Sequence, residues 1–170
     1  MAPVILPPEV EAVFRHYRVC EFSTLSRNGV PVTWPLVARF QREHNRFLLT
    51  ASIGFHQKAF NIRQNPRVAL LFSDPTGSGL SSPPAVLVQG DALAPDRVVA
   101  SLEGLETYWR DSVFRRQPFS KTFSAIPVVR MLMDWYYMRL LIFVTPRAIR
   151  WWPAGDFRQS AHIVEVPGVE

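Results

Sequence analysis

Short apolar segments bounded by turn-forming residues dominate the sequence and most constrain its fold. The clearest are RFLLTAS (46–52), RVALLFSD (67–74) and AVLVQGDALAP (85–95). Apolar runs of this length fit strands better than helices, and short connections favour antiparallel neighbours. Fifteen prolines and eight glycines provide many turns and strand ends. The pattern predicts a mainly β, α+β domain.

A β-hairpin is expected at Asn28-Gly29, because both residues tolerate positive φ in a two-residue turn. The returning strand would cover residues 30–40, where Pro31 and Pro35 indicate irregularity or an exposed edge.

Helices are expected at residues 8–18, 55–66 and 96–116, the last with Asp96 as its N-cap. Residues 117–135 fit a loop and a further helix. A helical insert at about 96–136 would therefore interrupt the strands.

The later strands carry their own signals. The segment 67–74 is apolar on both faces and should be central, and Gly90 indicates a bulge or a close backbone approach. Two final strands are expected at 136–146 and 148–153, before a loosely ordered tail. Six or seven mostly antiparallel strands with flanking helices favour a small barrel formed by the single domain 1–170.

The charge balance indicates an anionic partner. The formal net charge is +5 and the pI about 10.0. The arginines are scattered, however, and the longest basic run is Arg115-Arg116. Nucleic-acid-binding surfaces usually cluster their basic residues, so a small phosphorylated ligand is the favoured partner.

The sequence gives little support to a disulfide-linked, metal-binding, membrane or secreted protein. Cys20 is the single cysteine, so neither an internal disulfide nor a cysteine zinc site is expected, and the histidines lack metal-ligand spacing. Charged residues interrupt the apolar stretch 125–144, so no membrane span is expected. The N-terminal residues lack the features of a signal peptide, which predicts a cytoplasmic protein.

Lys58 is one of two lysines against seventeen arginines. It falls in the first turn of an expected helix, where a cation opposes the helix dipole. Thr50 and Ser52 lie just upstream, and hydroxyls and helix N-termini both bind phosphate. Two interpretations remain open: a solvated helix residue, or part of an anion site. His56 is similarly either a polar residue at the helix start or a neighbour of that site.

Three segments in this order, TLSRNGVPVTWPLV, RFLLTASIGFHQKAFNIRQNPRVALLF and AVLVQGDALAP, resemble the pyridoxamine 5′-phosphate oxidase-like family. The resemblance covers residues 20–95 well and residues 137–153 weakly. It implies a six-stranded antiparallel split β-barrel with flanking helices. It also implies a homodimer with FMN bound in grooves at the subunit interface.

The resemblance also implies a set of cofactor-binding residues. Thr50 and Lys58 would hold the phosphate, and Gln57 occupies a position that is often arginine in the oxidases. Arg39 would face the flavin, and Gln89 would reach its ribityl chain or ring. The remaining implied site residues are Thr33, Trp34, Pro35, Ala51, Ser52, Arg150 and Trp152.

The implied function is an FMN-dependent oxidoreductase that transfers a hydride at flavin N5 to or from an unidentified small substrate. The sequence lacks the C-terminal R.H.R block with which the oxidases bind their substrate, so oxidation of pyridoxamine phosphate is not expected. Two alternatives remain: a reductase that uses the deazaflavin coenzyme, and a non-catalytic flavin- or haem-binding protein. No catalytic side chain is identifiable.

Overall fold

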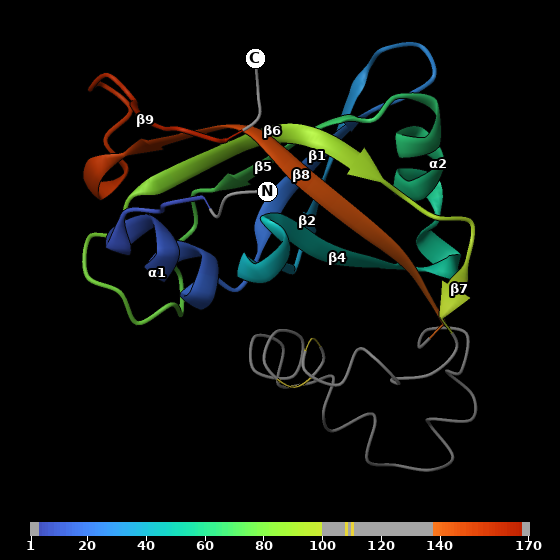
Figure 1. Cartoon of the computed structure of the whole chain (residues 1–170), viewed down its shortest axis with the longest axis horizontal. Coiled ribbons are helices and arrows are strands. Elements are labelled where there is room, and N and C mark those ends of the chain that lie inside the picture. The colour runs from blue at the N-terminus through green and yellow to red at the C-terminus, as the bar shows by residue number, and fades with distance from the viewer. Residues whose placement is uncertain (1–3, 100–107, 109, 111–137, 168–170) are drawn as a thin grey trace.

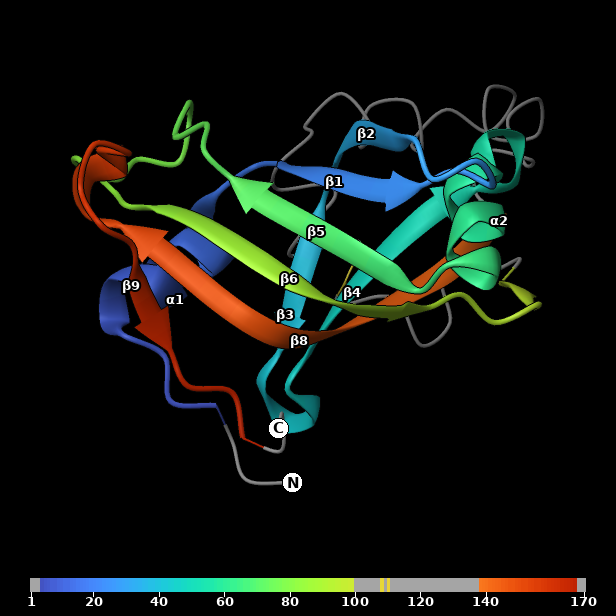
Figure 2. The same cartoon turned by 90° about the horizontal axis from the view of Figure 1, so that it is seen from above.

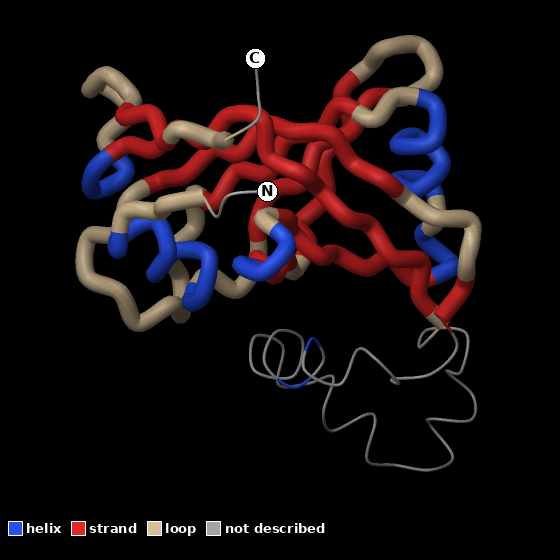
Figure 3. The backbone as a smooth tube through the Cα atoms, viewed as in Figure 1, coloured by secondary structure: helices blue, strands red, loops and turns tan. Residues whose placement is uncertain are grey.

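The computed structural model describes residues 4–99, Tyr108, Arg110 and 138–167. Strands predominate in this part of the chain, as Figure 3 shows. Its α-helices are α1 (Pro8–His16) and α2 (Gln57–Gln64), and its 3-10 turns are η1 (Arg42–His44), η2 (Ile53–Phe55) and η4 (Pro153–Gly155). Its strands are β1 (Cys20–Leu25), β2 (Pro31–Leu36), β3 (Ala38–Gln41), β4 (Arg46–Ser52), β5 (Arg67–Phe72), β6 (Ala85–Leu93), β7 (Val98–Val99), β8 (Arg139–Trp152) and β9 (His162–Val164).

All these strands join one antiparallel sheet in the order β2-β1-β5-β6-β8-β4-β3, with β7 and β9 also paired to β8. The sheet curls into a half-barrel, and α1 and α2 lie at opposite ends of it (Figure 1). The expectation of a mainly β domain with flanking helices is confirmed. As predicted from its apolar faces, β5 is interior to the sheet.

The concave face of the sheet encloses the core, which α1 covers at one end. Val10, Val13 and Phe14 of α1 are buried, and the Phe14 ring lies 4.9 Å from that of Phe47 and 5.1 Å from that of Phe72. Burial of a large apolar side chain contributes about 1.5–3 kcal/mol. This aromatic cluster therefore holds α1 against the sheet, away from α2.

The predicted hairpin exists, but its turn differs from the expected one. Ser26 and Val30 pair through a backbone hydrogen bond of 2.9 Å, which leaves a three-residue loop between them. Only Gly29 in that loop has a positive φ, of 76°. The returning segment is also two strands rather than one, because the chain changes partner at Val37, from β1 to β4.

The two strands expected at the C-terminal side are one strand, β8. Pro146 does not break it, because the β4 ladder ends at Val144 and the β9 ladder begins at Ile149, so only β6 pairs there. The register of β6 shifts at Gly90, as its glycine indicated. A Cβ at Gly90 would lie 2.2 Å from the carbonyl oxygen of Thr145, so the backbones approach too closely for any side chain.

Two further predictions need correction. Val98 and Val99 form a strand rather than part of a helix, because they pair with Leu140 and Arg139 of β8, and Asp96 forms an ion pair with Arg63 at 3.1 Å. The helices expected between residues 100 and 135 lie almost entirely outside the described residues. The tail is not loosely ordered throughout, since β9 pairs with β8 and buries Val164.

Candidate functional site

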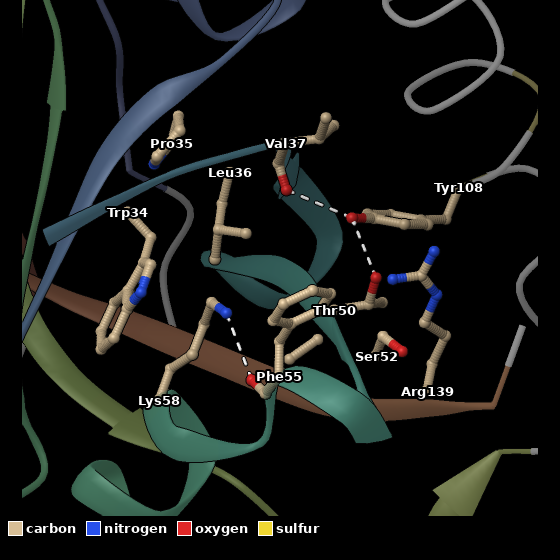
Figure 4. Close-up of a pocket in the computed structure, with 11 residues that line it drawn as sticks. Trp34, Pro35, Leu36, Val37, Thr50, Ser52, Phe55, Lys58, Tyr108 and Arg139 are labelled. Carbon is tan, nitrogen blue, oxygen red and sulfur yellow. Dashed lines mark hydrogen bonds between the residues drawn. The ribbon is translucent and has the colours of Figure 1, made fainter. Parts of the chain in front are cut away.

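A pocket of about 340 Å³ opens where the β2–β3 junction, the end of β4 and the start of β8 meet the N-terminus of α2. Its volume falls in the range of small-molecule sites. No aspartate or glutamate of the described chain lines it. Figure 4 shows its lining residues: Trp34, Pro35, Leu36, Val37, Thr50, Ala51, Ser52, Phe55, Lys58, Tyr108 and Arg139.

Lys58 lies inside this pocket and not in solvent. Its side chain is only 5% exposed, so the interpretation as a solvated helix residue is wrong. Its Nζ donates a hydrogen bond of 3.2 Å to the carbonyl oxygen of Phe55 (Figure 4). The same atom lies 5.0 Å from the ring centroid of Trp34 and 5.8 Å from that of Phe55. Such cation–π contacts stabilise an ammonium group only in part, and the described residues place no carboxylate within ion-pair distance.

Side-chain hydrogen bonds, one of them buried, fix the helix that carries Lys58. Asn61 donates to the hydroxyl of Thr24 on β1 at 2.9 Å, and Gln57 donates to the side-chain oxygen of Asn61 at 2.9 Å. Thr24 and Asn61 are both 1% exposed, so water does not compete for the bond between them, whereas Gln57 is exposed. The first turn of α2, and with it Lys58, is therefore held in place against the sheet.

Arg139 is the second cation of the pocket. It begins β8 opposite Ser52 and is buried. In the sequence it is one of the charges within the apolar stretch 125–144, and nothing in its local sequence marks it as a pocket residue. Burial is the main factor that lowers the pKa of Lys58, and repulsion from Arg139 lowers it further. The pocket thus concentrates positive charge in a poorly hydrated space.

Hydroxyl groups line the side of the pocket away from Lys58 (Figure 4). Thr50 donates to the Tyr108 hydroxyl at 3.4 Å, and Tyr108 donates to the carbonyl oxygen of Val37 at 3.2 Å. Ser52 accepts a hydrogen bond of 3.4 Å from the backbone N–H of Gly54. Ligand binding by Thr50 therefore requires its proton to turn away from Tyr108. Sequence reasoning did not identify Tyr108.

The structure brings together half of the residues that the sequence implied for a cofactor. Six of them line the pocket, namely Trp34, Pro35, Thr50, Ala51, Ser52 and Lys58. Gln57 lies beside it and bonds to α2 instead.

The other five implied residues lie elsewhere on the chain. Thr33 forms an exposed hydrogen bond of 2.7 Å with Ser23 across β1 and β2. Arg150 donates to Gln89 between β8 and β6. Arg39 pairs along β3 with β4, and the Trp152 ring packs on Phe157 with centroids 5.0 Å apart. None of the five lines the pocket of its own chain.

Solved structures with similar folds cover nearly the whole chain. A protein from Clostridium acetobutylicum, related to general stress protein 26 and of the pyridoxinephosphate oxidase family, matches with a TM-score of 0.60 at 11% identity, covering 95% of both chains. An F420 reductase matches with a TM-score of 0.56 at 22% identity, covering 85% of this chain and 98% of that protein. The fold is that of a pyridoxamine 5′-phosphate oxidase-like split barrel.

The same fold serves more than one ligand. A haem-binding protein from Mycobacterium smegmatis matches with a TM-score of 0.53 at 16% identity, covering 94% of this chain and 60% of that protein. No protein-family model and no curated relative matches the sequence. The residues of the pocket, rather than the fold, must therefore indicate what this chain binds.

Two features of the described residues bear on other ligands. These residues contain no cluster of three or more histidine, cysteine, aspartate or glutamate side chains that could hold a metal ion. None of their helices is both long and apolar enough to cross a membrane.

Proposed function

We propose that this chain binds a phosphorylated flavin coenzyme, FMN or its deazaflavin counterpart, and acts as an oxidoreductase on a small substrate. The observation that carries the proposal is the buried ammonium group of Lys58, which no carboxylate of the described residues approaches to ion-pair distance and which shares its pocket with a second cation, Arg139. Buried cations are costly unless an anion accompanies them. A phosphate group would supply that anion.

The pocket residues fit the parts of such a coenzyme. Lys58 and Arg139 would bind the phosphate, with the hydroxyl of Ser52 and the first-turn N–H groups of α2 as further donors. The apolar wall formed by Trp34 and Leu36 would flank the ring system. The coenzyme supplies hydride transfer when bound, and the chain supplies binding, orientation and exclusion of water.

We further propose that a second copy of the chain completes the site. Figure 2 looks onto the convex face of β1, β5, β6 and β8, which carries no described helix. Gln89 and Arg150 lie on these strands but outside the pocket. In a homodimer with the coenzyme at the interface, they would contact the partner's coenzyme. A monomer in sedimentation experiments with the coenzyme bound would contradict this arrangement.

The test is an absorbance spectrum of the purified protein, followed by titration with FMN and with the deazaflavin coenzyme. Fluorescence quenching of the ring reports binding, and inorganic phosphate should compete. Lys58→Met should weaken binding, whereas Arg15→Met is the matched control, because it removes one exposed charge on α1 outside the pocket.

The outcomes separate the alternatives. FMN binding that depends on Lys58 supports the flavoprotein, and binding of the deazaflavin coenzyme alone keeps the phosphate site but changes the hydride carrier. Haem binding without either coenzyme would contradict the proposed function. Equal losses in both variants would show that binding reflects net charge and not this pocket.

A further inference from the structure

Lys58 has surroundings that phosphate binding alone does not require. The side chain is buried beside two aromatic rings, and its Nζ donates a hydrogen bond to the backbone carbonyl of Phe55. Lysines in such surroundings lose their proton more readily, and the neutral amine is a nucleophile for carbonyl compounds.

We propose that Lys58, when the pocket holds no coenzyme, captures a small aromatic aldehyde that bears a carboxylate or phosphate, while Arg139 binds the anionic group. This use of the pocket goes beyond the proposed coenzyme binding. It depends on the same two cations, but it requires Lys58 to be neutral where phosphate binding requires it to be charged.

The chemistry is imine formation. The Nζ lone pair of Lys58 adds to the aldehyde carbon, which forms a C–N bond and opens the carbonyl π bond. Both N–H protons of the neutral amine are transferred to the former carbonyl oxygen, which leaves as water when the C=N bond forms. No oxidant or reductant takes part, and hydrolysis reverses the reaction.

Three features of the pocket select this class of aldehyde. The rings of Trp34 and Phe55 flank Nζ at 5.0 and 5.8 Å, so an aromatic aldehyde can stack beside them. Arg139 provides a planar guanidinium for an anion at a second point of the same pocket (Figure 4). The described lining residues include no carboxylate that would repel an anion.

The electrostatics of the pocket make the neutral amine easier to form. Burial and Arg139 both lower the pKa of Lys58. Among the described lining residues, Arg139 and Tyr108 are the titratable side chains that share the pocket with Lys58. Reaction near neutral pH should therefore be faster at Lys58 in the folded protein than in the unfolded chain.

The probe is 4-carboxybenzaldehyde, added to the full-length protein in an amine-free buffer at pH 7 and reduced with borohydride. Mass spectrometry of the digest identifies the labelled lysine, and the chain has only Lys58 and Lys121 to distinguish. The urea-unfolded chain gives the reference rate. Methyl 4-formylbenzoate, the neutral ester, is the matched probe because its carbonyl is at least as electrophilic but lacks the charge.

Lys58 should be labelled about tenfold or more faster in the native protein than in urea, and about tenfold or more faster by the carboxylate than by the ester. Arg139→Gln should abolish the preference for the carboxylate at Lys58 and leave the label at Lys121 unchanged. Circular dichroism confirms that the variant is folded. Native labelling of Lys58 no faster than in urea, or no preference for the charged probe, would overturn the inference.

The coenzyme titrations make the two proposals separable. Selective labelling without binding of FMN or the deazaflavin coenzyme supports aldehyde capture and contradicts the proposed function. Coenzyme binding with an unreactive Lys58 in the coenzyme-free protein does the reverse. If both proposals hold, saturating coenzyme should protect Lys58 from the label.

Discussion

Replacement of Lys58 by methionine should make the protein more stable while it weakens coenzyme binding. Methionine has nearly the same length but no charge, so it fills the space between Trp34 and Phe55 without a buried ammonium group. Substitutions that remove a functional charge of this kind commonly add about 0.5–2 kcal/mol to the free energy of unfolding. In a domain of this size that corresponds to roughly 1–8 °C in Tm.

The same substitution removes a charged donor to the proposed phosphate. A hydrogen bond to a charged group contributes about 1.5–3 kcal/mol, so Kd for FMN should rise roughly 10- to 150-fold. Calorimetric melting without coenzyme and fluorescence titration with it measure the two effects. Arg15→Met removes a charge from an exposed surface pair and should change either quantity little.

The pH dependence of the free energy of unfolding tests this prediction independently. Because the folded protein lowers the pKa of Lys58, the folded state binds fewer protons than the unfolded state between the lowered pKa and the ordinary lysine pKa of 10.5. The free energy of unfolding therefore rises with pH through that window, and the destabilisation is complete below it. Lys58→Met should remove this rise. A methionine variant that is less stable than the parent, or that retains full affinity for FMN, would refute the reasoning.

Three further substitutions test the structure around the site. Gly90→Ala should cost about 1–3 kcal/mol in denaturant unfolding, because its Cβ would meet the carbonyl oxygen of Thr145 at 2.2 Å. Asn61→Leu should cost about 1–3 kcal/mol, because it leaves the buried hydroxyl of Thr24 without its donor, and it should weaken coenzyme binding as well. Burial raises the pKa of Tyr17 to about 12, so the free energy of unfolding should fall as pH rises from 10.0 towards that value, and Tyr17→Phe should remove that fall.

The sequence predicted those elements whose residues decide their own structure. The bounds expected for β4 match the structure, and those for β5 and β6 are within two residues, because apolar runs and turn residues delimit them locally. The continuity of β8 through Pro146 could not be predicted in this way. It depends on the absence of a second neighbouring strand at that point and on the glycine opposite, both of which are tertiary facts.

Only part of the site could be predicted from the sequence. Lys58 stood out because a cation in the first turn of a helix conflicts with the helix dipole, and such a conflict calls for an explanation. Arg139 carries no comparable local conflict, and its role follows from the pairing of β8 with β4, which brings it opposite Ser52. Tyr108 is likewise distant in sequence from Thr50, from which it accepts a hydrogen bond. A single sequence contains no signal for contacts of this range.

The two proposals assign opposite protonation states to one amine, and the pocket can support both. Without a ligand, burial and Arg139 lower the pKa of Lys58, so the neutral amine forms more readily. A bound phosphate adds negative charge beside the amine in a space of low polarity, and that charge raises the pKa of Lys58 again. Coenzyme binding should therefore take up a proton at pH values above the lowered pKa. The same event that completes the anion site would remove the nucleophile, so coenzyme occupancy would decide which chemistry Lys58 performs.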